Sequence, residues 1–465
     1  MDYSAANTAL WNIIIQFGLI AGAILLCNML RNRVRAIRNA MMPVSVMAGF
    51  LLLLLKYTGL VRIDGDIMEI LVYHGIALGF IAMSLRVTNK AADSADRAAL
   101  KSGAVIVSTY MVQGVVGLVI SIALSLTVMP GLFKASGLLL PMGYGQGPGQ
   151  ANNVGTSYQN LGFAGGRSFG LAIAAAGYLC ACVVGVILLN ILAKRGHVTP
   201  AKKQTDDDLS VGFFQDQNEL PVADSIDRLS VQLAMVFVTY LATYLVTRGL
   251  TAGIAAISAG LANTVNTLLW GFNFIIGSGV AILLRTLLEA GRERGIIVRQ
   301  YQNNYLLNRI SGFFFDIMIV AGISSINIED LSGLWLYFIL LAVAGGMFTW
   351  LHLKRVCKWA YPDYYYEGLI SMYGMMTGTI SSGILLLREI DSDFHTPAAN
   401  NLVSGSSVGI ILGAPVLVLV SLAARSDLMA VVVCLIAAAY LGMLLLLLKK
   451  LGAGKKAKNA IHKKG

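Results

Sequence analysis

The feature that most constrains this chain is an apolar stretch at 141–157 that holds too many helix-breaking residues to form one helix. Glycine recurs there at every second position, at Gly143, Gly145, Gly147 and Gly149. A glycine inside a helix costs about 1 kcal/mol relative to alanine, and a proline, here Pro148, costs about 3 kcal/mol. No charged residue occurs from 135 to 166. Broken backbone at membrane depth is tolerated only where it is packed inside protein or lines a wet cavity, which is where a transporter binds its substrate.

Composition places the rest of the chain in a membrane. Of its 465 residues, 57% are hydrophobic and 13% are charged, whereas soluble domains average about 45–50% and about 25%. The net charge of +11 comes from short basic clusters between apolar segments. That pattern is typical of membrane topology signals and not of a nucleic-acid-binding surface. We therefore expect an all-α polytopic membrane protein in a lipid bilayer, with no nucleic-acid partner.

Eleven stretches are apolar over roughly the length at which a helix, rising about 1.5 Å per residue, crosses a hydrocarbon core about 30 Å thick. They cover residues 9–29, 42–61, 66–85, 102–128, 168–193, 229–249, 266–288, 310–328, 332–353, 397–422 and 428–448. Two further apolar stretches, 135–165 and 364–390, are broken and rich in polar residues. Neither has an uninterrupted run long enough to cross, so we interpret both as re-entrant hairpins.

The distribution of basic residues predicts the orientation. Basic clusters follow the first, third, fifth, seventh, ninth and eleventh spans, whereas the loops on the other side are short and poor in basic residues. Because basic loops stay in the cytoplasm, the N-terminus is predicted outside and the C-terminus inside. The first hairpin then enters the membrane from outside and the second from inside.

This topology predicts two inverted five-helix repeats, each with one hairpin. The first covers residues 1–193 and the second 229–425, with a cytoplasmic linker at 194–228 and an extra helix and basic tail at 426–465. Inverted repeats with broken helices that meet at the membrane midplane are typical of secondary transporters. A short echo between the hairpins agrees: Tyr144, Gly145 and Gly149 recur with the same spacing as Tyr373, Gly374 and Gly378.

The first hairpin offers neutral ligands for an anion and for a cation. We predict substrate binding by Gln146, Gly147, Gln150, Asn152 and Asn153, and sodium binding by Gly145, Gly149, Asn153 and Thr156. Half-helix N-termini carry positive partial charge and suit a carboxylate, whereas carbonyl and amide oxygens suit a hard cation. The alternative is a tight helix crossing or a buried bend, which so many polar side chains at lipid depth disfavour.

The second hairpin supplies hydroxyl groups in place of amides. We predict that it contributes Thr377, Thr379, Ser381 and Ser382 to the substrate site. The alternative is ordinary interhelical packing, in which threonine and serine also take part. At the end of this hairpin, Arg388 either counters a substrate carboxylate or pairs with Glu389 and Asp391.

Two ionisable residues inside apolar stretches are further candidates. Asp316 lies within the stretch 310–328, where a carboxylate can bind the coupling sodium, relay a proton or pair with a buried donor. His74 lies within 66–85 and is interpreted more simply as a hydrogen-bonded packing residue than as a proton carrier.

Signatures of an enzyme or of a bound cofactor are weak. The glycine-rich stretch lacks the lysine of a phosphate-binding loop and has no Gly-x-Gly-x-x-Gly pattern. The five cysteines have no metal-binding spacing. His395 and the serines of 404–407 lack the context of a nucleophile elbow. We expect no enzyme activity and no cofactor beyond a coupling sodium ion, and an intramembrane enzyme is the alternative from another class.

Several of these segments together resemble the bacterial sodium/glutamate symporter family. They are Met42–Phe50, Tyr110–Gly114, the first hairpin and Asp363–Asp391, and the order and spacing of spans are similar from about residue 10 to 425. The resemblance implies the inverted five-helix repeats, a homodimer in the bacterial cytoplasmic membrane, and sodium-coupled uptake of glutamate. It also implies an elevator-like movement of the hairpin-bearing core.

The chain departs from the family pattern at the implied site itself. Gln146 stands where the family often has histidine, and Pro148 where it often has threonine; the second hairpin lacks one glycine and a proline. The implied function is therefore sodium-coupled uptake of glutamate or a similar small anionic amino acid. The alternative within transport is a proton- or sodium-coupled carrier of dicarboxylates or hydroxycarboxylates.

Overall fold

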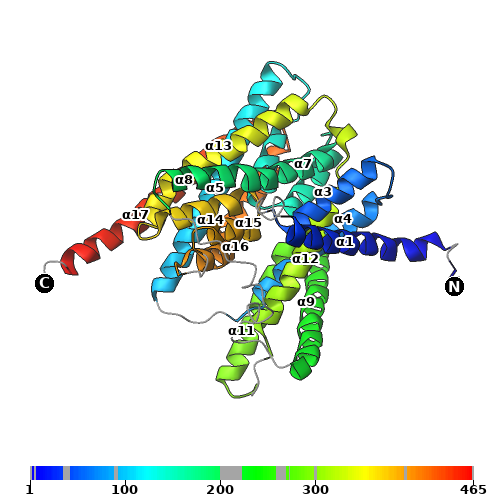
Figure 1. Cartoon of the computed structure of the whole chain (residues 1–465), viewed down its shortest axis with the longest axis horizontal. Helices are drawn as coiled ribbons and strands as arrows, with labels where there is room; N and C mark the ends of the chain where they lie inside the picture. Colours follow the sequence, from blue (N-terminus) through cyan, green and yellow to red (C-terminus); the bar gives the residue numbers. More distant parts are fainter. Residues whose placement is uncertain are drawn as a thin grey trace. The chain divides into compact units, whose positions relative to one another are not determined.

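The computed structural model shows a helical protein over the residues that it describes (Figure 1). These are residues 3–4, 7–34, 42–87, 93–198, 222–257, 269–271, 273–297, 301–391 and 395–462, and no strand occurs in these ranges. Nine helices among them are long and apolar enough to cross a membrane. They are α1 (Thr8–Arg33), α4 (Gly65–Ser84), α5 (Asp93–Leu126), the run α7–η3–α8 (Gly166–Lys194), α9 (Val222–Ile257), α11 (Asn273–Glu293), α12 (Asn304–Ser324), α13 (Trp335–Ala360) and α17 (Asp427–His462). The expected class of an all-α polytopic membrane protein is thereby confirmed.

Two of the eleven expected spans differ in form from a straight crossing helix. The stretch 397–422 is α16 (Ala398–Ala423), which is bent by 47° between Ser406 and Val408. The stretch 42–61 holds only α3 (Val44–Tyr57), a helix of 14 residues. At a rise of about 1.5 Å per residue, that helix falls short of a hydrocarbon core about 30 Å thick.

The early end of α3 has a local cause that its apolar composition conceals. Gly59 takes a positive φ of 75°, and the amide of Leu60 turns back to donate to the Leu55 carbonyl at 3.1 Å. A left-handed glycine closing the last turn is a common helix stop. The apolar residues Leu60 and Val61 therefore lie beyond the helix, and the prediction of a full-length span at 42–61 was wrong.

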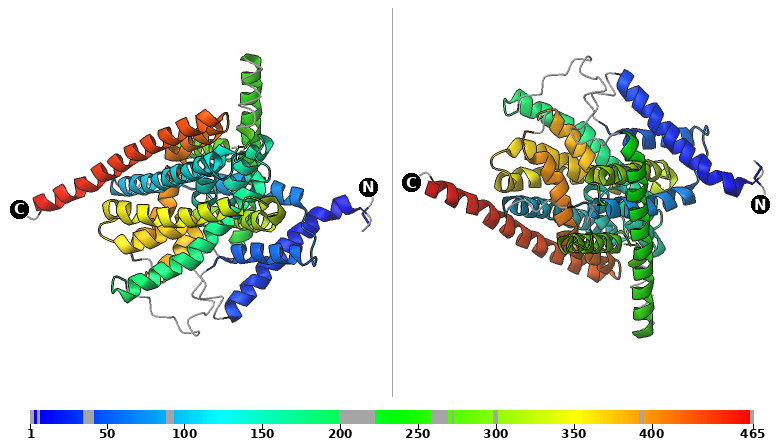
Figure 2. Two further views of the ribbon diagram at one scale, coloured as in Figure 1. Left: turned by 90° about the horizontal axis from the view of Figure 1, so that it is seen from above. Right: turned by 90° about the horizontal axis from the view of Figure 1, so that it is seen from below.

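The chain divides into two compact units, with boundaries inside α4 and α12. Unit 1 comprises 1–73, 91–199 and 316–465, and unit 2 comprises 74–90 and 200–315. In unit 1, α5 is the central helix and packs against α13, α16 and α17. Figure 2 shows α5 (cyan) beside α13 (yellow) in both views.

Small residues allow α5 and α16 to approach closely. A Cβ built on Gly405 would lie 2.6 Å from the Ser102 Cβ, and one built on Gly103 would lie 2.7 Å from a Val408 methyl. In lipid, where the hydrophobic effect does not drive helices together, this kind of close backbone contact is a main source of association.

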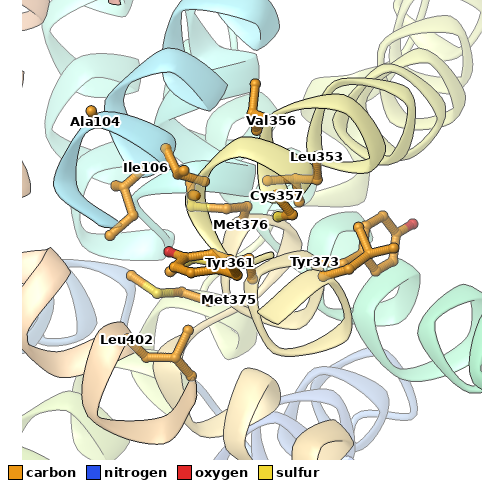
Figure 3. Close-up of a cluster of buried hydrophobic side chains, with 14 of the residues drawn as sticks. Ala104, Ile106, Leu353, Val356, Cys357, Tyr361, Tyr373, Met375, Met376 and Leu402 are labelled. Carbon is orange, nitrogen blue, oxygen red and sulfur yellow. The ribbon is translucent and has the colours of Figure 1, made fainter. Parts of the chain in front are cut away.

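A buried cluster joins α5, α13 and α16 to the second hairpin (Figure 3). Met375 and Met376 from the end of α14 (Tyr365–Thr377) pack there with Leu353, Tyr361 and Leu402. Their burial anchors the end of α14 next to the point where the second hairpin breaks.

Unit 2 contains α9, α11 and the adjoining parts of α4 and α12. Its core includes Ile81 of α4, Val236 of α9 and Ala281 of α11. His74 Nδ1 lies 2.7 Å from the Tyr240 hydroxyl oxygen, which is the bond that the packing interpretation of His74 requires. Most of the predicted linker, 199–221, lies outside the described residues, and its last part already belongs to α9.

Candidate functional site

The first hairpin breaks between two helical segments, at Gln146 and Gly147. A wide helical turn, η2 (Pro141–Gly145), precedes the break and α6 (Pro148–Asn160) follows it. Gly147 has φ 90° and ψ −176°, a conformation that is essentially restricted to glycine. Pro148 starts α6, where its missing N–H costs no hydrogen bond. The interruption expected from the glycine and proline pattern is therefore present.

The second hairpin breaks at Gly378 and Thr379, between α14 and α15 (Ile380–Arg388). Thr379 is extended, with φ −140° and ψ 173°, whereas Gly378 has φ −134° and ψ −106°, which is neither helical nor extended. Position 378 requires glycine because its neighbours leave too little space for a side chain. A Cβ on Gly378 would lie 2.9 Å from Ser382 Oγ and 3.2 Å from the Ala181 Cβ.

Both breaks lie against one short segment of the α7–η3 helix. Gly177 contacts the Thr377 carbonyl of the second hairpin and, at 3.1 Å from a built Cβ, the Tyr144 ring of the first. The Tyr178 hydroxyl lies 3.8 Å from a Cβ built on Gly147. With Ala181 beside Gly378, about one and a half helical turns touch both hairpins. We call this meeting of the two breaks at residues 177–181 the hairpin junction.

Gln113 of α5 bridges the two hairpins at the junction. Its Nε2 donates to the Met376 carbonyl at 2.9 Å and to Thr349 Oγ1 of α13 at 2.8 Å. On the other side, its Oε1 lies 2.9 Å from a Cβ built on Gly145. Sequence reasoning did not assign this residue a role, although an amide in the middle of an apolar span is the kind of signal that finds one.

Three buried oxygens around the first break have no hydrogen-bond partner in the part of the chain that the structure describes. They are Oε1 of Gln113, Oε1 of Gln150 and the hydroxyl of Tyr178, on side chains that are at most 2% exposed. A buried polar group without a partner costs about 1–3 kcal/mol. Each such atom in a native protein needs an explanation, for which a bound ion or water is one. Of the three, only Gln150 was among the residues predicted to form the site.

Farther along α6, two predicted residues join a charged cluster on the flank of the junction. The Asn152 Oδ1 accepts from Arg167 Nε at 2.9 Å, and Thr156 Oγ1 donates to Glu69 Oε1 at 3.3 Å. Arg167 and Glu69 are themselves paired at 3.5 Å. Sequence reasoning missed both, although Glu69 is an acid inside the apolar stretch 66–85 and Arg167 is the first charge after the uncharged stretch 135–166.

The other predicted residues of the first hairpin lie at or just beyond the break. Gln146 is half-buried at the break itself, while Gly145 and Gly149 are buried on either side of it. Asn153 is buried one turn into α6, and its carbonyl accepts from Ser157 Oγ at 2.9 Å.

In the second hairpin, the described hydroxyl groups lie within hydrogen-bonding distance of groups in the same hairpin. Thr377 Oγ1 donates to the Tyr373 carbonyl at 2.8 Å, and Thr379 Oγ1 lies 3.5 Å from Ser382 Oγ. Ser381 follows the break in the first turn of α15, and its side chain lies outside the described atoms.

Arg388 lies away from the breaks, whereas Asp316 lies within electrostatic reach of Tyr178 at the first break. Arg388 is exposed at the opposite end of α15 from the break, so its position does not favour a role against a substrate carboxylate. Asp316 has an exposed side chain within hydrogen-bonding reach of the Ser45 hydroxyl. Its helix reaches the junction farther on, where a Cβ on Gly322 would lie 3.2 Å from the Pro148 Cβ.

Asp391 of the second hairpin has its own local partners. Its carboxylate accepts from the amides of His395 and Thr396 at 2.8 and 2.9 Å, and from Thr396 Oγ1 at 2.6 Å. Burial alone would raise the pKa of Asp391, but these hydrogen bonds outweigh it and hold the pKa below its ordinary range.

No protein-family model and no curated protein sequence matches the chain. Its function is therefore inferred from the geometry of the hairpin junction.

Proposed function

We propose that the chain is a secondary active transporter that couples the inward movement of sodium to the uptake of glutamate or a similar small anionic amino acid. The observation that carries this proposal is the hairpin junction, where two broken helices meet against residues 177–181 with no charged side chain in either broken segment from 135 to 166 or from 368 to 387. Discontinuous helices that meet in this way form the substrate and ion sites of secondary transporters.

The ends of the half-helices support an anionic substrate. The N-termini of α6 and α15 begin at the two breaks. A helix N-terminus carries about half a positive charge together with unpaired backbone N–H groups, so it attracts a carboxylate without a formal charge of its own. The Tyr178 hydroxyl beside Gly147 adds a donor that has no described partner.

The same surroundings favour an amino acid over a dicarboxylate. The Gln150 Oε1 is buried in the first turn of α6 and lacks a donor among the described residues. The carboxamide oxygen can accept from the ammonium group of an amino acid, a donor that a dicarboxylate lacks. This supports the preference for an anionic amino acid.

The proposed movement is elevator-like alternating access in a bacterial cytoplasmic membrane, with the N-terminus outside, the C-terminus inside, and a homodimer as the functional unit. The two hairpins belong to inverted repeats in this proposal. Their matching tyrosines support it, since Tyr373 has its hydroxyl 3.1 Å from Cys180 Sγ and Tyr144 interacts with the same thiol.

The test is uptake of labelled glutamate by proteoliposomes under an imposed inward sodium gradient. We expect uphill accumulation that stops when choline replaces sodium at fixed pH, and competition by aspartate that exceeds competition by malate. Absence of sodium-dependent accumulation contradicts the proposal. Equilibration without accumulation indicates a channel, and chemical conversion of a substrate without transport indicates an enzyme.

A further inference from the structure

We infer that Oε1 of Gln113 is a ligand of a monovalent hard cation bound between the two hairpins. The identification of this cation as the coupling ion rests on the proposed function. None of the sodium ligands predicted from the sequence lies on α5, so Gln113 adds a further helix to the ion site.

The orientation of the Gln113 carboxamide follows from its partners. The Met376 carbonyl can only accept, and it lies 2.9 Å from Nε2. Turning the amide over would set the Gln113 and Met376 carbonyl oxygens against each other and lose the bond to Met376. The Thr349 hydroxyl takes the second N–H of Nε2 at 2.8 Å. Oε1 is therefore directed toward Gly145 and the first break.

The oxygen directed there is fully buried and unsatisfied. Gln113 is 0% exposed, and Oε1 has no hydrogen-bond partner in the described ranges. The nearby backbone comes close, with Oε1 at 2.9 Å from a Cβ built on Gly145. The same built Cβ would lie 2.5 Å from the Tyr110 ring, so Gly145 packs closely against both Tyr110 and Oε1, and a larger residue at 145 would displace them.

The electrostatic surroundings select a cation. The α14 helix ends at Thr377, so the Met376 carbonyl belongs to its last turn, and the last carbonyls of a helix carry negative partial charge. An unpaired carboxamide oxygen beside that helix end is stabilised by a positive ion and destabilised by an anion. Neutral oxygen ligands suit sodium-like hard cations, whereas softer metals prefer nitrogen and sulfur.

An ion bound to Gln113 would couple the positions of the two hairpins, because this side chain contacts both. Nε2 of Gln113 holds the end of α14, and Oε1 faces the end of η2. A cation on Oε1 polarises the amide and strengthens the bond from Nε2 to Met376. Ion binding at the first break then stabilises the position of the second.

The experiment is the thermal unfolding of the purified full-length protein at increasing sodium chloride, with choline chloride holding ionic strength constant. A ligand that binds the native state raises the unfolding midpoint. We expect sodium to raise it in the wild type. In Gln113→Leu the half-saturating sodium concentration should rise by on the order of tenfold or more, as for lost metal-site interactions. Gly442→Ala is the control, because a Cβ on Gly442 meets nothing within 4 Å, and it should keep the half-saturating sodium concentration of the wild type.

A second variant covers the case in which Gln113→Leu does not fold. Gln113→Glu retains an oxygen and becomes ionisable, so its sodium response should strengthen as pH rises through the titration of the new carboxyl group. A wild-type sodium response in folded Gln113→Leu, a pH-independent wild-type response in Gln113→Glu, or no sodium response in the wild type would each overturn the inference.

Failure of the ion site and failure of the transport function give different results. Sodium binding that depends on Gln113, without glutamate uptake, supports the site and contradicts the function. Sodium-driven glutamate uptake that is unchanged in Gln113→Leu supports the function and overturns the site.

Discussion

The two hairpins of this protein break in different ways. The difference indicates which hairpin recognises the ligand and which one completes the junction around it. In the first, Gly147 adopts a backbone conformation restricted to glycine, and the break is surrounded by polar atoms without described partners. In the second, Gly378 keeps a negative φ of −134° and is needed for space, and Thr377 bonds to the backbone of its own helix. We therefore assign ligand recognition mainly to the first hairpin, while the second completes the junction.

The largest effect is expected where both hairpins depend on one residue. Gly177→Ala places a methyl group against the Thr377 carbonyl and the Tyr144 ring. Since neither backbone can move without disturbing its hairpin, we expect glutamate uptake to be nearly abolished and the protein to lose about 1–3 kcal/mol of stability, as in overpacked cores. Uptake in proteoliposomes and thermal unfolding measure the two effects.

Gly442→Ala is the matched control for that substitution, because a Cβ on the exposed Gly442 of α17 meets nothing within 4 Å. It should keep wild-type uptake and stability. Full uptake in Gly177→Ala contradicts the joint dependence of the hairpins on α7.

The next effect distinguishes the two breaks directly. Gly147→Ala forces a side chain into the conformation restricted to glycine, at a cost of about 1–3 kcal/mol, and no neighbouring substitution relieves this cost. Gly378→Ala instead meets Ser382 Oγ at 2.9 Å. Adding Ser382→Ala should therefore recover part of the lost stability and uptake. Unfolding midpoints and uptake measure this recovery. If Ser382→Ala does not improve Gly378→Ala, the two breaks do not differ in the way described.

A smaller effect is expected at the flank of the first hairpin. Arg167 donates to Asn152 at 2.9 Å, and a hydrogen bond to a charged group contributes about 1.5–3 kcal/mol. Arg167→Gln and Asn152→Ala should each reduce uptake at low glutamate, and the double variant should lose less than the sum of the two. Arg388→Gln is the control, because Arg388 is exposed at the far end of α15. Additive losses, or a larger loss in Arg388→Gln, would contradict this assignment.

The smallest effect concerns the pH dependence of stability. Hydrogen bonds hold the pKa of Asp391 below its ordinary range despite its burial. A lowered folded-state pKa stabilises the protein above the unfolded carboxyl pKa of about 3.9, and this stability is lost as pH falls through the folded value. Asp391→Asn should therefore unfold more easily than wild type at pH 7, with the gap closing in acid. Thr396→Val, which leaves both backbone bonds, should be intermediate.

The sequence predicted what depends on local chemistry. The break at Gly147 follows from alternating glycines and a proline, and the spanning helices follow from long apolar runs. The short α3 was missed because Leu60 and Val61 continue an apolar run past the turn that ends the helix. Local patterns do not reveal such a turn when its flanking residues are apolar.

Residues joined over long sequence distances were not predictable in this way. Gln113 acquires its role through Met376, 263 positions away, and Tyr178 through its approach to Gly147. Conversely, Arg388 was a candidate because its charge follows an apolar stretch, yet the direction of α15 carries it away from the break. The pairing of breaks against α7 is a tertiary property, and only the folded chain shows it.

The proposed transport requires that both breaks form one binding site. The most direct test uses the single-cysteine variants Gln146→Cys and Thr379→Cys, made in a transport-competent protein that lacks the native cysteines. Both positions are half-buried at their breaks. The rate of maleimide modification is measured with sodium, with glutamate and with both. We predict that sodium and glutamate together slow modification at both positions, while an exposed Arg388→Cys reacts unchanged. Protection at one break alone, or at neither, would contradict a shared site.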